Sequence, residues 1–157
     1  MNNKMDKKFR EDKGKVARGG ANKRKFPSKA ATYIHENSLD IGRVLDFGCG
    51  YGLDAASFGW ECYDPYYHDI KLEGLFDTII CINVISAVSK HNETKILEEI
   101  KKLLKEDGKA YIAVPRTLTK EGKLSGYNRR PQRYIVLKNE SIFKNEKFEI
   151  YLIKKND

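Results

Sequence analysis

The sequence lacks any apolar run of about 18 residues, so it predicts no membrane-spanning helix. Its first residues, MNNKMDKKFREDKGK, are basic but contain no apolar core, which argues against a secretory signal in this stretch. Cysteine is scarce, because the chain contains only Cys49, Cys62 and Cys81. An odd number at these spacings fits neither a disulfide framework nor a zinc site, and no other metal-binding pattern stands out. We therefore expect buried thiols, no metal and a reducing, cytoplasmic compartment.

The composition is that of a globular protein with one domain. The chain has 157 residues, of which 40% are hydrophobic and 33% are charged. Its net charge of +8 is unevenly placed, because residues 1–29 contain eleven Lys or Arg and only three acids, which leaves the remainder neutral. We predict a basic, flexible arm over residues 1–27 and a folded domain over residues 28–157.

A second basic segment, residues 116–133, contains six Lys or Arg and one acid. Together with residues 1–29 it predicts a polyanionic partner, most simply DNA or RNA. Tyr127 could stack on a base while nearby arginines contact phosphates. The predicted acceptor-binding residues are Arg116, Tyr127, Arg129, Arg130 and Arg133. The alternative is that both segments are solvated surface charge without a partner.

Apolar patterns alternate between strand and helix along the chain. The predicted helices cover 28–37, with Ser28 as N-cap, and 93–105, with Asn92 as N-cap. The predicted strands cover 43–47, 60–63, 76–84, 110–114, 133–137 and 148–153. The last two are joined by a connection too short for a helical crossover, so they are expected to pair antiparallel. This order predicts an α/β, three-layer sandwich with a mostly parallel sheet and a terminal antiparallel hairpin.

The most informative segment is VLDFGCGYGLD, residues 44–54, in which a strand ends and the chain turns through three glycines. Such a turn lets a ligand approach the backbone closely. Asp64, at the end of the second strand, is placed to accept the hydroxyls of a ribose. Asp46, two residues before the first glycine, would repel a phosphate but suits a cationic group. A ribose and an amino acid without phosphate describe S-adenosylmethionine, and no G-K-[ST] follows to indicate a P-loop.

These residues carry a family resemblance. The D-x-G-C-G-x-G motif resembles the first motif of class I S-adenosylmethionine-dependent methyltransferases, which have a Rossmann-like fold. Asp64 matches the acidic second motif, FDTIICINVI the fourth-strand motif, and GKAYIAV the following strand. The likeness covers roughly residues 28–153. RVLDFGCGYGLDA with YDPYY, FDTI and QRYIVL is similar to a compact group of phage and bacterial methyltransferases, whose relatives are associated with DNA phosphorothioation.

The resemblance implies S-adenosylmethionine as cofactor, S-adenosylhomocysteine as product, and roles for individual residues. Asp46 would lie near the amino group of the methionine moiety, and Asp64 would bind the ribose. Asn83 would lie beside the methyl group, and Asn83 and Ser86 are the candidate catalytic residues. The implied cofactor-binding residues are Asp46, Gly48, Cys49, Gly50, Gly52, Asp64, Pro65, Tyr66, Asn83 and Val84.

One departure from the family pattern is expected. Only 12 positions separate Gly52 from Asp64, and another 12 separate Asp64 from Phe76. A full helix and a third strand do not fit after the second strand, so this region should be reduced. In the strand numbering of the family, the sheet order would become 2-1-4-5-7-6. The adenine side of the site would then be open, and the basic N-terminal region could cover it.

The leading interpretation is an in-line methyl transfer to nucleic acid, which needs positioning more than an acid or base. A methyltransferase acting on a small molecule or a protein is the first alternative. The second is a nucleic-acid-binding module that keeps the cofactor pocket without transferring methyl groups.

Overall fold

The computed structural model describes residues 23–117 and 132–157. Tyr127, Arg129, Arg130 and most of the predicted N-terminal arm lie outside these residues. The helical elements are α2 (Lys29–Glu36), α3 (Leu53–Phe58), the short 3-10 turn η2 (Ile85–Ala87) and α4 (Lys90–Leu103). The strands are β1 (Val44–Phe47), β2 (Glu61–Tyr63), β3 (Phe76–Ile82), β4 (Leu104–Pro115), β5 (Glu140–Lys144) and β6 (Phe148–Lys154).

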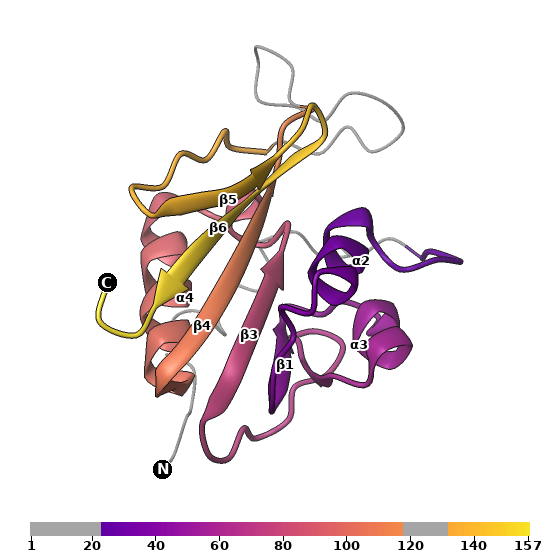
Figure 1. Cartoon of the computed structure of the whole chain (residues 1–157), viewed down its shortest axis with the longest axis vertical. Helices are drawn as coiled ribbons and strands as arrows, with labels where there is room; N and C mark the ends of the chain where they lie inside the picture. The colour runs from indigo at the N-terminus through magenta and orange to yellow at the C-terminus, as the bar shows by residue number, and fades with distance from the viewer. Residues whose placement is uncertain (1–22, 118–131) are drawn as a thin grey trace.

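The six strands form one sheet in the order β2-β1-β3-β4-β6-β5. The strands β1 to β4 pair in parallel, whereas β6 pairs antiparallel with both β4 and β5. Helix α4 covers one face of this sheet, and α2 and α3 lie together on the other side (Figure 1). The predicted α/β architecture with a terminal antiparallel hairpin is therefore confirmed.

Two apolar clusters explain the three layers. On β3, Ile79 packs in the cluster that contains Ile96 and Ile100 of α4, whereas its neighbour Ile80 packs in the cluster that contains Ile34 of α2. Successive strand residues point to opposite faces, so an apolar run such as FDTIICI must be covered on both sides. This is why the run behaves as a central strand.

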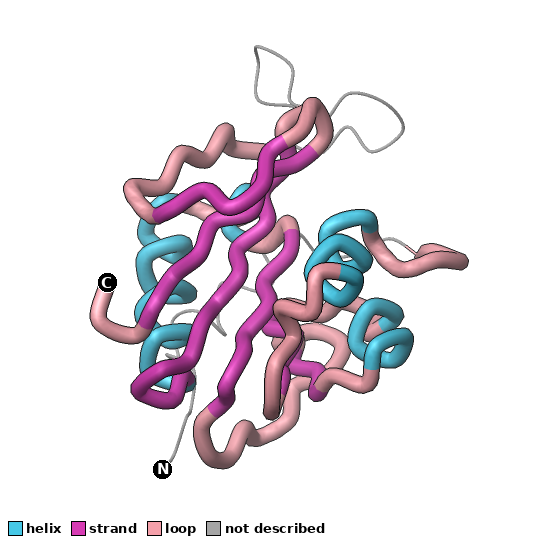
Figure 2. The backbone as a smooth tube through the Cα atoms, in the orientation of Figure 1, coloured by secondary structure: helices cyan, strands magenta, loops and turns pink. Residues whose placement is uncertain are grey.

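The connection between β2 and β3 is reduced, as the spacing predicted. Residues 64–75 contain one isolated bridge, between Asp64 and His68, and no helix. Figure 2 shows this connection as loop. The observed order matches the expected one with the third strand of the family left out. Among the residues that the structure describes, no helix is long and apolar enough to cross a bilayer.

Helix α2 begins as expected, because Ser28 Oγ accepts the amide proton of Ala31 at 3.1 Å. Helix α4 begins earlier than expected. Its N-cap is Ser89, whose Oγ accepts the amide proton of Asn92 at 3.2 Å, so the prediction of Asn92 as the cap is wrong. Asn92 lies inside the helix and is buried.

The predicted strand at 133–137 is also wrong, because the partner of β6 is β5, residues Glu140–Lys144. The alternation that suggested a strand is present, since Ile135 is buried between the exposed side chains of Tyr134 and Val136. Within residues 23–117 and 132–157, this segment nevertheless pairs with no strand. Its backbone is held from the other side, where the Arg133 amide donates to the Ser86 carbonyl at 2.8 Å. Alternation of apolar and polar residues indicates that one face of a segment is buried, but it does not show that the segment pairs with another strand.

Candidate active site

The glycine turn joins β1 to α3 at the carboxyl end of the sheet. Gly48, Gly50 and Gly52 all have positive φ angles, of 83°, 58° and 84°. The amides of Gly48 and Cys49 donate to the carbonyl of Tyr63, at 2.7 and 3.0 Å, which ties the turn to the end of β2. A Cβ at Gly48 would lie 2.4 Å from a methyl group of Val84. The turn therefore packs directly against the segment that follows β3, and Gly48 leaves no room for a side chain.

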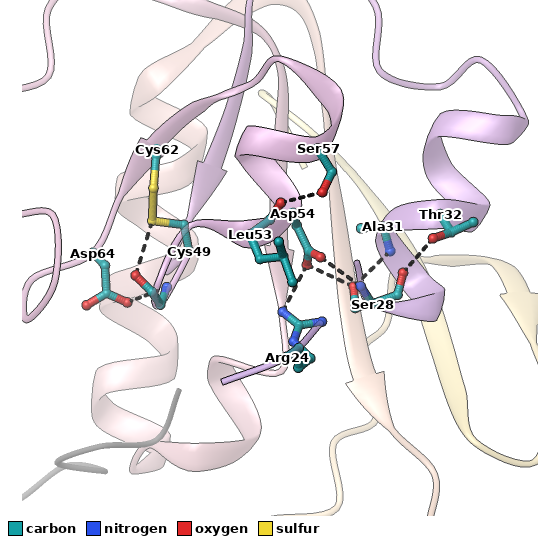
Figure 3. Close-up of polar contacts among 11 residues, drawn as sticks. Arg24, Ser28, Ala31, Thr32, Cys49, Leu53, Asp54, Ser57, Cys62 and Asp64 are labelled. Atoms are coloured by element: carbon teal, nitrogen blue, oxygen red, sulfur yellow. Dashed lines mark hydrogen bonds and ion pairs between the residues drawn. A yellow bond between two sulfur atoms is a disulfide. The ribbon is translucent and has the colours of Figure 1, made fainter. Parts of the chain in front are cut away.

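Asp64 follows β2 and points at this turn (Figure 3). Its Oδ2 accepts the amide proton of Gly50 at 2.9 Å, and its Oδ1 accepts those of Tyr66 and Tyr67 at 2.8 and 3.2 Å. A carboxylate oxygen offers two acceptor directions, so these contacts leave capacity for further donors. The geometry suits a carboxylate that is fixed by the backbone and receives hydroxyl groups of a ligand.

Asp46 lies in β1, and only 3% of the residue is exposed. Burial raises the pKa of its carboxyl to about 8, and the neighbouring carboxylates of Asp54 and Asp64 add to this shift. The positive charge of Arg24 acts in the opposite direction. A cationic group placed beside Asp46 would favour its ionised form in the same way.

Asp54, in the first turn of α3, completes a group of three buried carboxyls around the turn, and the sequence analysis missed it. It accepts the backbone amide and the hydroxyl of Ser28 at 2.7 and 2.8 Å, and Arg24 lies 3.4 Å from it (Figure 3). The acid two residues after the last glycine was the available signal. Asp54 fixes the start of α2 to the glycine turn, and it draws the end of the basic N-terminal segment toward the site.

Replacing Asp54 by Ala should release this connection. The backbone amide and hydroxyl of Ser28 would lose a charged acceptor, which typically lowers the free energy of unfolding by about 1.5–3 kcal/mol. Urea unfolding followed by circular dichroism measures this loss. Asp107→Ala, which changes an exposed carboxylate in β4, is the matched control and should change stability by less than about 0.5 kcal/mol. Equal stability of Asp54→Ala and the wild type would contradict the anchoring role.

Three further residues proposed for the site follow β3. Asn83 has a φ angle of 57°, unusual for a residue with a side chain, and its side chain is exposed. Val84 is the residue that packs against Gly48. Ser86 is only 1% exposed, and its hydroxyl donates to the side-chain oxygen of Gln132 at 2.8 Å. In this placement the hydroxyl anchors Gln132, and the catalytic role of Ser86 stays a prediction.

The aromatic residues beside Asp64 gather with one from the glycine turn. The ring centroids of Tyr51 and Tyr67 lie 4.6 Å apart, and those of Tyr66 and Tyr67 lie 6.4 Å apart. Lys23 lies 6.0 Å from the centroid of the Tyr51 ring. Pro65 is half-buried at the start of this group. The three tyrosines, which we call the tyrosine group, form an aromatic surface at the edge of the site.

The side chain of Arg116 is only 4% exposed and has internal partners, so its contact with a polyanion stays a prediction. Its guanidinium forms an ion pair with the buried Glu149 at 2.6 Å and also donates to the carbonyl of Ile135.

Arg133 has internal partners as well. It donates to the carbonyls of Val88 and Ile85 at 2.6 and 3.0 Å, and it pairs with Glu93 at 3.0 Å. These contacts position the turn between β3 and α4. Any contact of Arg133 with an acceptor stays a prediction.

The expectation of three free thiols is also wrong. Cys49, in the glycine turn, forms a disulfide with Cys62 of β2, with Cα atoms 5.8 Å apart, and Cys81 alone is a free, buried thiol. The reason is the parallel pairing of β1 with β2, in which Phe47 lies opposite Tyr63. This register brings the residues beyond Phe47 back alongside the end of β2. Strand pairing, and not sequence spacing, creates the contact.

Comparison with known proteins identifies the class. Residues 21–144, well over half of the chain, match the family described as methyltransferase domain, and the chain belongs to that family. The structure is similar to a 1,6-didemethyltoxoflavin-N1-methyltransferase from Burkholderia thailandensis, solved with bound 1,6-didemethyltoxoflavin and S-adenosylhomocysteine. The identity is 16% and the TM-score 0.53, over 82% of this chain and 77% of that one. The protein is thus a methyltransferase domain with the fold of the enzymes that use S-adenosylmethionine as cofactor.

Two rickettsial proteins are similar over shorter stretches. PKMT2 from Rickettsia typhi, solved with S-adenosylhomocysteine, is 27% identical with a TM-score of 0.37, over 48% of this chain and 21% of that one. The uncharacterized protein RP028 of Rickettsia prowazekii (strain Madrid E) is 29% identical, over 48% of this chain and 43% of that protein. The chain therefore spans less than half the length of these relatives.

Proposed function

We propose that the protein binds S-adenosylmethionine at the glycine turn and directs transfer of its methyl group to nucleic acid. The observation that carries the cofactor site is the pair of carboxyls, Asp46 and Asp64, on neighbouring strands at either side of the turn. Asp46 is buried, and a nearby cation favours its ionised form. Asp64 is fixed by hydrogen bonds from three backbone amides. These features match a ligand with an ammonium group and a ribose.

The residues of the site fit this cofactor better than a phosphate-bearing one. Three buried carboxyls, Asp46, Asp54 and Asp64, surround the turn, and the negative charge of Asp54 and Asp64 would repel a pyrophosphate. Gly48 packs closely against Val84, so at this position the turn consists of backbone atoms without a side chain. Asp64 would hold the ribose hydroxyls, and Asp46 would face the methionine ammonium.

Bound S-adenosylmethionine supplies an activated methyl group, and the protein has to bind and align the reacting molecules. Alignment at about 3 Å can provide several kcal/mol of the rate enhancement. Asn83 is the residue best placed to contact the acceptor, because it is exposed and directly precedes Val84. An amine acceptor needs little assistance from a base, in keeping with the internal role of Ser86.

The tyrosine group and the basic segment beside it support nucleic acid as the acceptor. Tyr51 is 47% exposed and lies below the ammonium group of Lys23, and Lys23, Arg24 and Lys25 continue the basic run of residues 1–29. Exposed aromatic rings next to cations are typical of surfaces that stack bases and contact phosphates. The resemblance to the phosphorothioation-associated group makes DNA the first acceptor to test.

Calorimetric titration with S-adenosylhomocysteine tests the cofactor site. Asp64→Ala should weaken binding at least about 100-fold, because it removes both the ribose acceptor and the contact that shapes the turn. Asp107→Ala, which changes an exposed carboxylate in β4, is the matched control and should bind like the wild type. Equal binding by Asp64→Ala and the wild type would overturn this site.

Transfer of labelled methyl groups to DNA, RNA, protein and small-molecule mixtures tests the acceptor. We expect label in nucleic acid, with a rate that falls as salt is raised and falls further in Tyr51→Ala. Label that enters only protein or small molecules would overturn the acceptor and leave the cofactor site intact. Cofactor binding without transfer to any acceptor would instead indicate a binding module.

A further inference from the structure

We propose that Cys49, Cys62 and His68 form a binding site for Zn²⁺ when the disulfide is reduced. Their three ligand atoms lie within 4.8 Å of one another. They come from separate segments, namely the glycine turn, β2 and the loop after β2, and Figure 3 shows the two cysteines side by side next to Asp64. The sequence alone predicted no metal site. Cys49 is also among the implied cofactor-binding residues, whereas Cys62 and His68 are not, so variants of Cys62 and His68 test the metal site separately from the methyl transfer.

The sulfur of Cys62 and the imidazole of His68 both lie beside Gly52. A Cβ at Gly52 would lie 3.2 Å from Cys62 Sγ and 3.3 Å from His68 Nε2. The backbone of His68 is held by two hydrogen bonds with Asp64, of 3.1 and 2.9 Å. Its half-buried imidazole forms no hydrogen bond with residues 23–117 or 132–157. The backbone bonds hold His68 beside the turn, and within the described residues Nε2 is available as a ligand.

Two thiolates and one imidazole are a typical donor set for Zn²⁺, with water as the fourth ligand. In a tetrahedral site the two sulfur atoms would stand about 3.8 Å apart, so the disulfide and the metal site are alternative states. Two equivalents of a small thiol reduce the disulfide to two Cys thiols and are themselves oxidised to one disulfide. Zn²⁺ then replaces the two thiol protons, which are released to solvent, and His68 donates a lone pair.

The disulfide and the metal site would have the same structural role, which is to connect the glycine turn to β2. Cys49 stands between Gly48 and Gly50, and either the disulfide or the metal ties it to Cys62 on β2. Disulfides persist poorly in a reducing compartment, whereas zinc thiolates are stable there. The metal would thus fix the glycine turn under conditions in which the disulfide is lost.

Titration of the reduced, full chain with Co²⁺, as a spectroscopic probe for Zn²⁺, tests the site. We expect one Co²⁺ per chain, with a thiolate-to-cobalt charge-transfer band and the intense visible bands of tetrahedral coordination. Zn²⁺ should abolish these bands by displacement. Cys62→Ser and His68→Gln should lose the tetrahedral bands, whereas the matched control Cys81→Ser should retain them. Oxidised protein should show no charge-transfer band, because both sulfurs are bonded to each other.

Far-UV circular dichroism of each variant separates loss of ligands from loss of fold. The proposal is overturned if folded, reduced wild-type protein with three titratable thiols shows no charge-transfer band. It is equally overturned if the bands persist unchanged in folded Cys62→Ser or folded His68→Gln. A parallel titration with S-adenosylhomocysteine keeps the two proposals distinguishable, since cofactor binding without cobalt binding would remove only the metal site.

Discussion

Replacing Arg116 by Met is expected to lower the free energy of unfolding by about 3–5 kcal/mol, the usual effect of removing one partner of a buried ion pair. The guanidinium donates to Glu149 Oε1 through Nε and Nη2, at 3.0 and 2.6 Å. It also donates to the carbonyl of Ile135 and to the hydroxyl of Tyr151. Methionine fills similar volume but leaves the Glu149 carboxylate buried without its cation. Urea unfolding at pH 7 measures the loss.

The pH dependence gives this prediction a second signature. Hydrogen bonds from Ser141, Arg116 and Tyr151 hold the pKa of Glu149 below its usual range, against the opposing effect of burial. A group with a lowered pKa in the folded state adds stability above its unfolded pKa, and this stability is lost as the pH falls. Without the cation of Arg116, the stability that ionised Glu149 adds becomes smaller or changes sign, because burial then opposes the charge. The difference between Arg116→Met and the wild type should therefore be largest near pH 7 and diminish toward pH 3.

Two further variants control the experiment. Lys105→Met removes the exposed ion pair with Asp77, at 3.1 Å, and should change stability by less than about 1 kcal/mol. Arg116→Met combined with Glu149→Leu removes both charges and should recover part of the lost stability. If Arg116→Met instead keeps full stability and loses only nucleic-acid binding, Arg116 is a surface contact after all and the internal role is wrong.

The features that sequence analysis predicted correctly are local. The glycine turn depends on the residues between β1 and α3, and the central strand β3 depends on its own apolar run. The reduced segment after β2 followed from counting positions. Each of these depends on a short stretch of chain, whose periodicity and glycine content are visible without knowledge of the partners.

The features that it missed depend on partners far away in the sequence. Arg116 looked like part of a basic surface because Glu149, its partner, lies in another strand. Charge counting cannot distinguish an internal ion pair from an exposed cation. The Cys49–Cys62 disulfide follows from the parallel register of β1 and β2, and the bridge between Asp64 and His68 then brings His68 to both cysteines. Sequence spacing carries no information about that register.

Asp46 should give the protein an unusual dependence of stability on pH. Its pKa is raised to about 8 in the folded state by burial first, and then by the charges of Asp54 and Asp64, compared with about 3.9 in an unfolded chain. Between these values the folded protein holds a proton that the unfolded chain has released. The contribution to stability is therefore fully present below pH 4 and is lost as the pH rises through 8, by about 1.4 kcal/mol per pH unit.

Asp46→Asn isolates this effect, because the amide cannot ionise. The unfolding free energy of the variant relative to the wild type should rise steadily from pH 5 to pH 8 and then level off. Asp107→Asn, an exposed carboxylate, should show no such slope over that interval. A constant difference between Asp46→Asn and the wild type from pH 5 to pH 9 would show that Asp46 is already ionised in the folded protein.

The same carboxyl links stability to the proposed cofactor site. If the methionine ammonium lies beside Asp46, binding favours the ionised carboxylate and drives off its proton. Titration with S-adenosylhomocysteine at pH 7, in two buffers of different ionisation enthalpy, should therefore reveal release of nearly one proton by the wild type and almost none by Asp46→Asn. Binding should tighten between pH 6 and 7.5, before the ammonium itself begins to lose its proton. Binding without proton release, alongside the predicted stability slope, would place the ammonium elsewhere and make the raised pKa of Asp46 purely a property of the fold.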